Sequence, residues 1–244
     1  SDKDIAFEIM EREPTFDIEK RLKEKGLIYD EYSFVFYIYW NDLKIIPGIY
    51  YLKKNMNLKQ ILKLISQGNI KEYKITIIEG WRREQIAQML AENNIVDYQE
   101  FMNSSAGKEG YLFPDTYRIS INATASDIVN KLIKNFNEHT KGLEVTKKDI
   151  ILASIVEREA KKDEDRAKIA GVYFNRLESG MKLEADPTVQ YAKGEDWPKL
   201  SISDYTSVQS PYNTYLYKGL PPTPICNPGL ASIKAVLNPI NHKY

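Results

Sequence analysis

The chain is poor in the residues that build metal sites and disulfides. Its 244 residues include one cysteine, Cys226, and two histidines, His139 and His242. A lone cysteine cannot form an internal disulfide, and neither histidine has the paired spacing of a zinc site. No glycine-rich loop of the kind that cradles a phosphate occurs either. We therefore expect no metal and no other cofactor.

An excess of charge of either sign is also missing. Thirty-four lysines and arginines balance 34 aspartates and glutamates, so the field on which nucleic-acid binders rely is absent. A DNA or RNA partner is not expected. No apolar run reaches the roughly 18 residues of a membrane span, and SDKDIAFEIM at the N-terminus is too charged for a signal peptide. The chain is expected to be soluble, and its 43% hydrophobic content is enough for folded cores.

The first hundred residues alternate helical patterns with aromatic segments. SFVFYIYW (33–40), GIYYL (48–52) and YKITIIEG (73–80) are rich in aromatic and β-branched residues, which predicts strands. Pro47-Gly48 predicts a turn between the first two. Asn57 fits a helix N-cap and Gly68 a helix stop, with apolar residues at helical spacing between them.

A weak internal repeat runs through the same region. Each copy reads as a short amphipathic helix, then an apolar pair, then a polar turn. The matching positions are Ile18, Leu22, Leu27, Ile28 and Phe34 in one copy, and Ile86, Leu90, Ile95, Val96 and Phe101 in the other.

The sequence pattern changes after the small, polar segment NSSAGKEG (103–110), and this change predicts a domain boundary there. Helices are expected near Ser126–Asn137, over ILASIVEREAKK (151–162) and from about Asp165 to Leu177. From Gly180 onward proline-stiffened loops dominate, and such loops commonly line sites. The predicted fold class is α+β, with an N-terminal region (1–105) followed by a mixed α/β region with long Pro-rich loops (106–244).

Glu157 is a carboxylate that directly follows an apolar helical stretch. On a helical wheel it falls with Ala153, Ser154 and Ala160, whereas Glu159 falls on another side. A stripe of small residues leaves room for a bulky ligand. A carboxyl group among apolar neighbours has its ionised form disfavoured, as a general acid requires. A salt bridge from Glu157 to Arg158, Lys161 or Arg166 is the structural alternative.

Several sequence blocks in order resemble the endolytic murein transglycosylases, the YceG-like family. They are EGYLFPDTY, LASIVEREA, AGVYFNRLESGMKLEADPTVQY, SPYNTYLYKGLPPTPICNPG and IKAVLNP, which together span Glu109 to Pro239. The resemblance implies lytic cleavage of peptidoglycan glycan strands between N-acetylmuramic acid and N-acetylglucosamine, with 1,6-anhydro ends as product. It also implies a LysM-like subdomain, here at about residues 33–74.

The same resemblance implies the site residues and the setting. The glutamate after LASIV, Glu157, is the expected catalytic residue, acting first as general acid and then as base. Asn175 and Arg176 are expected to be structural, and Glu184 stands where many relatives carry glutamine. An N-terminal anchor absent from this chain, action on the outer face of the bacterial cytoplasmic membrane and work beside glycan-polymerising synthases are also implied. The expected substrate-binding residues are Glu184, Asp186, Gln190, Tyr191, Tyr212, Asn213 and Tyr215.

Two other functions remain open from the residues alone. One is a water-using muramidase, in which Asp186 or Glu184 supplies a second carboxylate. The other is a non-enzymatic glycan-binding scaffold built on the LysM-like part.

Overall fold

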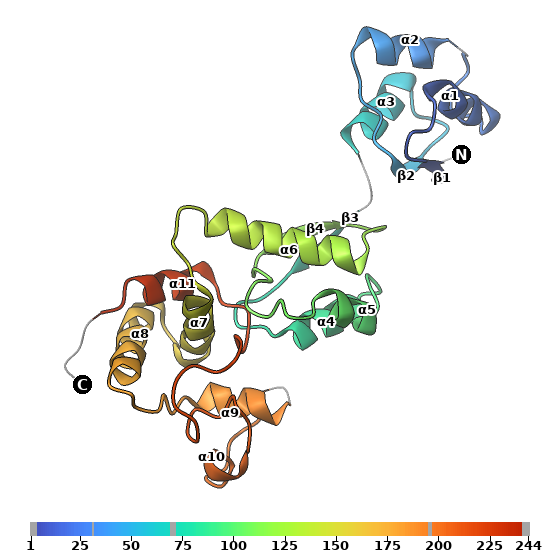
Figure 1. The fold of residues 1–244 in the computed structure, drawn as a ribbon. Coiled ribbons are helices and arrows are strands. Elements are labelled where there is room, and N and C mark those ends of the chain that lie inside the picture. The colour runs from blue at the N-terminus through green and yellow to red at the C-terminus, as the bar shows by residue number, and fades with distance from the viewer. Residues whose placement is uncertain (1–3, 31, 69–71, 195–196, 241–244) are drawn as a thin grey trace. The chain divides into compact units, whose positions relative to one another are not determined.

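The structure is a computed structural model that describes residues 4–30, 32–68, 72–194 and 197–240 (Figure 1). Helices and two small two-stranded sheets make it an α+β protein, as predicted. The chain forms two compact units: unit 1 runs to Tyr73 and takes in Ser120–Asn122, and unit 2 comprises Lys74–Ile119 and continues from Ala123. Among the described residues, no helix has the length and apolar character needed to cross a membrane.

Unit 1 is a two-stranded sheet with three helices. The strands β1 and β2 are antiparallel, with Ile5 opposite Leu52, and alternate residues of both strands point into the core. The core of the unit is apolar, and Phe7, Phe34 and Leu52 are fully buried in it. The elements in order are β1 (Ile5–Ile9), α1 (Thr15–Glu24), α2 (Ser33–Trp40), β2 (Gly48–Leu52) and α3 (Leu58–Gln67).

The prediction of a strand over SFVFYIYW is wrong, because this segment forms helix α2. Phe34 and Ile38 lie one helical turn apart and are the buried residues of α2, which is a helical pattern within an apolar run. The predicted limits of α3 are confirmed. Asn57 accepts a hydrogen bond from the Gln60 N–H in a capping box, and Gly68 ends the helix in the left-handed conformation.

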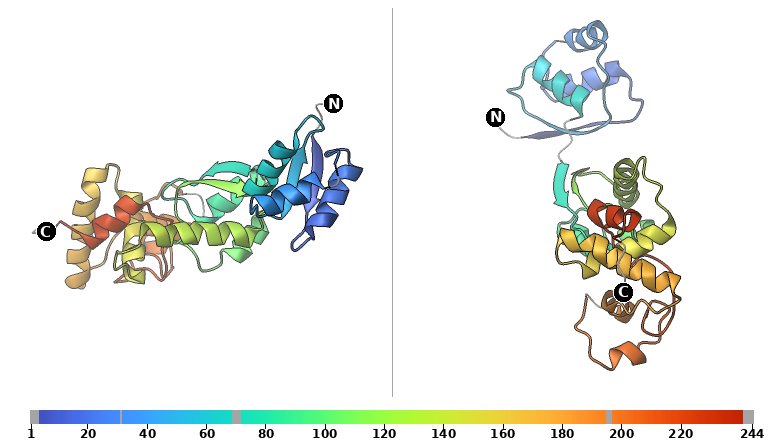
Figure 2. Two further views of the ribbon diagram at one scale, coloured as in Figure 1. Left: turned by 90° about the horizontal axis from the view of Figure 1, so that it is seen from above. Right: turned by 90° about the vertical axis from the view of Figure 1, so that its left-hand side faces the viewer.

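Unit 2 is mostly helical, and α7 packs against α8, α9 and α11 (Figure 2). The predicted helices near 126–137, 151–162 and 165–177 are confirmed as α6, α7 and α8, with shifted ends. The strand predicted at 73–80 is β3, which pairs with β4. The elements are β3 (Glu72–Thr76), α4 (Arg83–Glu92), α5 (Tyr98–Ser104), β4 (Thr116–Ser120), α6 (Ala125–His139), α7 (Lys147–Glu159), α8 (Asp163–Glu178), α9 (Asp186–Lys193), α10 (Asp204–Ser207) and α11 (Leu230–Leu237).

The units divide after Tyr73, whereas the sequence predicted a break at residues 103–110. That segment is packed inside unit 2, because Ser105 is fully buried and Glu109 nearly so. Helix α5, which ends at Ser104, also packs against both α4 and α6. The polar composition of residues 103–110 therefore belongs to a tight connection within unit 2.

The internal repeat is longer in the structure than the sequence indicated. Both copies follow the order strand, helix, helix, strand, helix, with β1 to α3 as the first copy and β3 to α6 as the second. In each, the first helix is closed by a residue of positive φ, and the next N–H donates to the carbonyl five residues earlier. The residues of this closure are Leu22, Gly26 and Leu27 in the first copy and Leu90, Asn94 and Ile95 in the second.

The later parts of the two copies match as well. A tyrosine on the second strand donates its hydroxyl hydrogen to the carbonyl four residues earlier, and the third helix begins with a reciprocal capping box. The matching residues are Tyr50, Asn57 and Gln60 in the first copy and Tyr117, Thr124 and Asp127 in the second. The same local scaffold is therefore built twice in this chain.

Candidate active site

The last turn of α7 places three charged side chains in three different surroundings. The helix starts with a capping box of Thr146 and Asp149, and it stops at Glu159 because Ala160 is extended. Glu157 and Glu159 are two residues apart, so they point to different sides of the helix. Arg158 lies between them, with its guanidinium carbon 3.8 Å from the centre of the Trp197 ring.

Glu157 is buried in a polar cluster. Its Oε1 accepts a hydrogen bond from Nη1 of Arg166 at 2.9 Å, and its Oε2 accepts one from the Gly229 N–H at 2.9 Å. The side chain is only 5% exposed. Arg166 is held in turn by Asp163 and by Ser232, whose Oγ is 2.6 Å from Nη1. Glu157 therefore ties α7 to α8 and α11, and both of its oxygens are occupied.

The sequence predicted that Glu157, and not Glu159, faces a cleft, whereas the structure places Glu159 on a cavity wall and bonds both oxygens of Glu157; the catalytic role of Glu157 stays a prediction. The small residues of its helix face do not open a path for a ligand, because Ala153 and Ser154 are fully buried. They instead admit the main chain of the segment that follows Pro224. The Ile225 N–H donates to the Ser154 Oγ at 3.0 Å, and the thiol of Cys226 donates to the Ser154 carbonyl.

Glu159 lies on the wall of a cavity of about 370 Å³. The hydroxyl of Tyr173 donates to its Oε1 at 3.1 Å, and the backbone N–H of Asp186 also bonds to its carboxylate. Burial raises the pKa of Glu159, and the charge of Asp186 raises it further, while the two hydrogen bonds lower it. The full lining is Glu159, Ile169, Val172, Tyr173, Arg176, Leu183, Glu184 and Asp186.

Asp186 is the second carboxylate at this cavity, and it begins a helix. The segment ADPTVQY was expected to be a loop, but Asp186–Lys193 is α9, with Pro187 in its first turn and Gly194 as a left-handed cap. Two tyrosine hydroxyls donate to Asp186, that of Tyr215 at 2.6 Å to Oδ1 and that of Tyr205 at 3.3 Å to Oδ2. Asp186 is thus fixed beside Glu159.

Glu184 contributes a third carboxylate and an unusual backbone. Its φ is +52°, a left-handed conformation that costs a non-glycine residue energy, and its N–H donates to the Thr214 carbonyl. The side chain pairs with Arg176, whose Nη1 lies 3.2 Å from Oε2 and also donates to the Leu183 carbonyl. Arg176, expected to be structural, holds this turn and also lines the cavity.

Of the other predicted binding residues, Tyr215 reaches Asp186, whereas the remaining four do not line this cavity. Gln190 donates to the Pro198 carbonyl, and Asn213 is fully buried and bonds to the loop around it. Tyr191 packs on Tyr212 with ring centres 4.8 Å apart. Their role in binding stays a prediction.

Tyr191 instead lines a second cavity, of about 260 Å³, beside the buried carboxyl group of Glu109. Asn227 donates to Glu109 at 2.8 Å, and the Arg83 N–H donates to the other oxygen. Burial raises the pKa of Glu109 to about 8, and the nearby charge of Glu84 adds to the rise. Asn227 also accepts from the N–H groups of Gly110 and Leu112, so it links segments that are far apart in sequence.

Within the described ranges, no cluster of three or more His, Cys, Asp or Glu side chains is arranged to hold a metal ion. His139 stacks on Phe113 with ring centres 4.4 Å apart. His242 lies outside the described residues.

A family model described as the YceG-like family matches residues 7–244. The chain belongs to the YceG-like family. A solved structure of a YceG-like protein from Listeria monocytogenes is similar, with a TM-score of 0.62 and 31% identity, covering 99% of this chain and 92% of that one.

Two curated relatives of this YceG-like chain carry the name endolytic murein transglycosylase. The one from Bacillus subtilis (strain 168) is 32% identical over 261 residues, which cover 91% of this chain and 72% of the relative. The one from Streptococcus pneumoniae serotype 2 is 29% identical over 290 residues, which cover 98% of this chain and 53% of the relative. The chain therefore spans about half the length of the pneumococcal relative.

Sequence reasoning missed the residues that surround Glu159. Tyr173 lies on α8 at a position typical of an apolar residue in an amphipathic helix. Tyr205 lies on the four-residue helix α10, in a segment where the sequence has no helical pattern. The only sequence signal for Glu159 was the helical wheel. It placed Glu157 and Glu159 on different sides of the helix but did not indicate which side faces the cavity.

Proposed function

We propose that this YceG-like chain is an endolytic peptidoglycan transglycosylase and that Glu159 is its catalytic residue. The observation that carries the assignment is the cavity lined by Glu159, Asp186 and Tyr173, with Tyr215 bonded to Asp186. The names of the relatives support the substrate class. The sequence resemblance implies Glu157 for this role; its two carboxylate oxygens accept hydrogen bonds from Arg166 and Gly229, whereas Glu159 lines the cavity.

The reaction needs one group that gives and then takes a proton. Glu159 in its acid form donates its proton to the glycosidic oxygen that leaves from C1 of N-acetylmuramic acid. The C6 hydroxyl of the same sugar then bonds to C1, and its proton passes to the Glu159 carboxylate. The acid is regenerated, a 1,6-anhydro end is formed and no water is consumed. Such proton transfer contributes about a hundred- to ten-thousand-fold in rate.

The neighbours of Glu159 suit this cycle. Burial and the charge of Asp186 raise its pKa, so a larger protonated fraction is available than for an exposed glutamate. The carboxylate of Asp186, oriented by Tyr215 and Tyr205, provides negative charge near the positive charge that develops at C1. Both groups sit on helix ends, which keeps their geometry fixed.

A water-using muramidase is the second candidate, because Asp186 lies next to Glu159 and could act as the second carboxylate. Mass spectrometry of the products from purified glycan strands separates the two reactions. We expect 1,6-anhydro ends, and we expect Asp186→Asn to slow cleavage without changing the product. Reducing ends from the unmodified chain would establish hydrolysis instead, and no cleavage at all would favour the scaffold.

The pH dependence of cleavage tests whether Glu159 is the general acid, because replacing Tyr173 changes the pKa of Glu159. Because the Tyr173 hydrogen bond lowers the pKa of Glu159, Tyr173→Phe is expected to raise it. A general acid acts in its protonated form, so the alkaline limb of kcat/KM should move to higher pH. Tyr39→Phe, an exposed position on α2, is the control and should leave the profile unchanged. An unmoved limb in Tyr173→Phe would remove Glu159 from the role of acid.

The wider setting of the enzyme follows the resemblance. We propose action outside the cytoplasmic membrane, through an N-terminal anchor, on peptidoglycan strands made by neighbouring glycan-polymerising synthases. The LysM-like assignment of residues 33–74 and the catalytic assignment of residues 106–244 belong to the same proposal. Because Lys74–Ile119 and the chain from Ala123 lie in unit 2, the scaffold of the catalytic part includes helices α4, α5 and α6 of the second copy of the repeat.

A further inference from the structure

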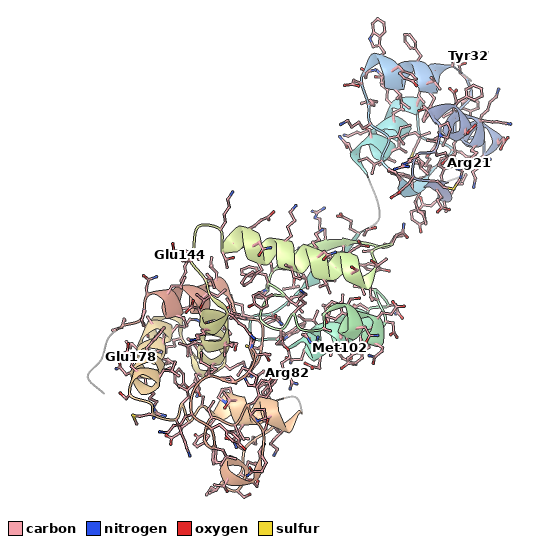
Figure 3. All side chains as sticks on the ribbon, in the orientation of Figure 1. Arg21, Tyr32, Arg82, Met102, Glu144 and Glu178 are labelled. Carbon is pink, nitrogen blue, oxygen red and sulfur yellow. The ribbon has the colours of Figure 1, made fainter. Side chains whose placement is uncertain are left out.

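The cavity beside Glu109, of about 260 Å³, is not used by the proposed mechanism. It shares no lining residue with the cavity at Glu159, and the two reach opposite ends of α7, because Lys147 begins that helix and Glu159 ends it. The side chain of Arg82 reaches from the start of α4 to Tyr191 of α9, with its guanidinium carbon 4.5 Å from the centre of the ring (Figure 3). The cavity is therefore a separate feature of unit 2.

Glu109 supplies a hydrogen-bond donor to this cavity. The residue is 6% exposed, and burial raises its pKa to about 8, so it is mostly protonated at neutral pH. Its two oxygens accept hydrogen bonds from the Asn227 side chain and from the Arg83 N–H. Neither bond uses the hydrogen of the acid itself, because both donors are N–H groups. That hydrogen is available to a ligand that brings an acceptor.

Other polar atoms of the lining are unpaired within the described part of the chain. Oε2 of Glu84 is buried and accepts no hydrogen bond there, and Nε of Arg82 lies 3.3 Å from it without hydrogen-bond geometry. The hydroxyls of Tyr111 and Tyr191 form no hydrogen bond with a described residue either. Polar atoms left without partners around a cavity indicate a site for a polar ligand.

We propose that the cavity beside Glu109 binds an N-acetylated amino sugar. The acetamido group brings a carbonyl oxygen that accepts the hydrogen of Glu109 and an N–H that donates to Glu84. The ring hydroxyls bond to Tyr111 and Tyr191. A ligand carboxylate has no hydrogen for Glu84, and an ammonium group has no acceptor for Glu109. Pockets for drug-sized ligands measure about 300–1,000 Å³, so 260 Å³ suits a single sugar unit.

The source of the sugar, a peptidoglycan strand, rests on the proposed function. Because the cavity is separate from Glu159, the sugar that it holds lies away from the bond that is cut. The site therefore positions the strand and takes no part in proton transfer. A peptide offers the same amide atoms, but it lacks the ring hydroxyls that would meet the two tyrosines.

Titration with N-acetylglucosamine, followed through the amide signal of Gly107 in nuclear magnetic resonance, tests the proposal. Gly107 lines the cavity and has open space beside it. We expect its signal to shift and to saturate. Glucose, which has no acetamido group, should need at least about tenfold higher concentration, because Glu109 and Glu84 then stay unpaired. N-acetylalanine methylamide, the probe for a peptide, should also bind more weakly.

The double variant Tyr111→Phe/Tyr191→Phe removes two hydroxyls that have no partner among the described residues. It should weaken N-acetylglucosamine binding at Gly107 at least about fivefold, while thermal unfolding hardly changes. Tyr217→Phe, at a half-exposed position outside both cavities, is the control and should bind as the unmodified chain does.

The affinity for N-acetylglucosamine should also fall as the pH rises from about 7 to about 9, because Glu109, with a pKa of about 8, loses the hydrogen that it donates. The sugar does not ionise in this range. Burial raises the pKa of Tyr111, Tyr191 and Cys226, which keeps these three groups uncharged. The titratable and charged groups that surround Glu109 are Arg82, Arg83, Glu84, Tyr111, Lys147, Tyr191 and Cys226.

An unshifted Gly107 signal would overturn the proposal, as would equal binding by the double variant or an affinity that does not change with pH. Tighter binding of N-acetylalanine methylamide would assign the cavity to a peptide and would also overturn it. Peptide-free glycan strands, added to the Glu159→Gln chain, should shift Gly107 at a lower sugar concentration than the free sugar does. Strands that leave Gly107 unshifted would exclude the strand as the occupant.

Binding is measured without turnover, so this site and the proposed function can fail separately. A chain that cleaves strands but shows an unshifted Gly107 would refute the binding site alone. A chain that binds the sugar at Gly107 but does not cleave strands would refute the proposed function alone.

Discussion

Glu159→Gln is expected to lower the rate of glycan cleavage at least about a hundredfold, the lower bound for losing a general acid. Glutamine keeps the shape and can still accept the Tyr173 hydrogen bond, but it has no proton to donate. The free energy of unfolding should hardly change, because burial disfavours the charge that the variant removes. The measurements are the initial rate of muropeptide release and urea-induced unfolding.

Glu157→Gln is the matched control, two residues away on the same helix. It weakens the contact with Arg166, so we expect unfolding to become easier by about 2 kcal/mol, with cleavage largely retained below the melting temperature. The two variants should therefore show opposite patterns. A stable but inactive Glu157→Gln together with an active Glu159→Gln would return the catalytic role to Glu157.

Arg166→Met is expected to lower the free energy of unfolding by about 3–5 kcal/mol, the usual effect of leaving a buried charge without its partner. Arg166 is 8% exposed and its guanidinium contacts Glu157, Asp163 and Ser232, so its loss strands the Glu157 carboxylate inside the protein. Denaturant unfolding measures the effect.

The double variant Arg166→Met/Glu157→Leu distinguishes a stranded charge from lost packing. Removing both charges should restore most of the stability lost in Arg166→Met, because the buried carboxylate is gone and the other partners of Arg166, Asp163 and Glu79, are solvated by water. A double variant as unstable as the sum of the two single ones would mean that the ion pair itself, rather than its burial, stabilises unit 2.

Local signals in the sequence predicted helix ends well. Asn57 and Gly68 bound α3 as expected, because capping depends on residues within one turn of the helix end. The strand prediction at residues 33–40 failed for the opposite reason. A short apolar run fits a strand or a helix equally, and burial of Phe34 and Ile38 decides the matter only once the rest of unit 1 has formed.

The internal repeat carried more information about the secondary structure of residues 33–40 than their composition did. It paired Phe34 with Phe101, and the helical pattern around Phe101 would have indicated a helix at α2 as well. The side of α7 that faces the cavity could not be predicted in this way. The wheel separates Glu157 from Glu159, but the identity of the cleft side depends on where α8, α9 and α11 dock, and those contacts join residues distant in sequence.

The long-range bonds of Asn227 determine when the cavity beside Glu109 can form during folding. Its side chain holds the backbone at Gly110 and Leu112 and the carboxyl group of Glu109, more than a hundred positions earlier. Segments so far apart meet only after much of the chain has been ordered, so this part of unit 2 should assemble late in folding. While the chain emerges from the ribosome, the partly made protein would lack this link, and the cavity beside Glu109 would take its shape only once the segment around Asn227 has been made.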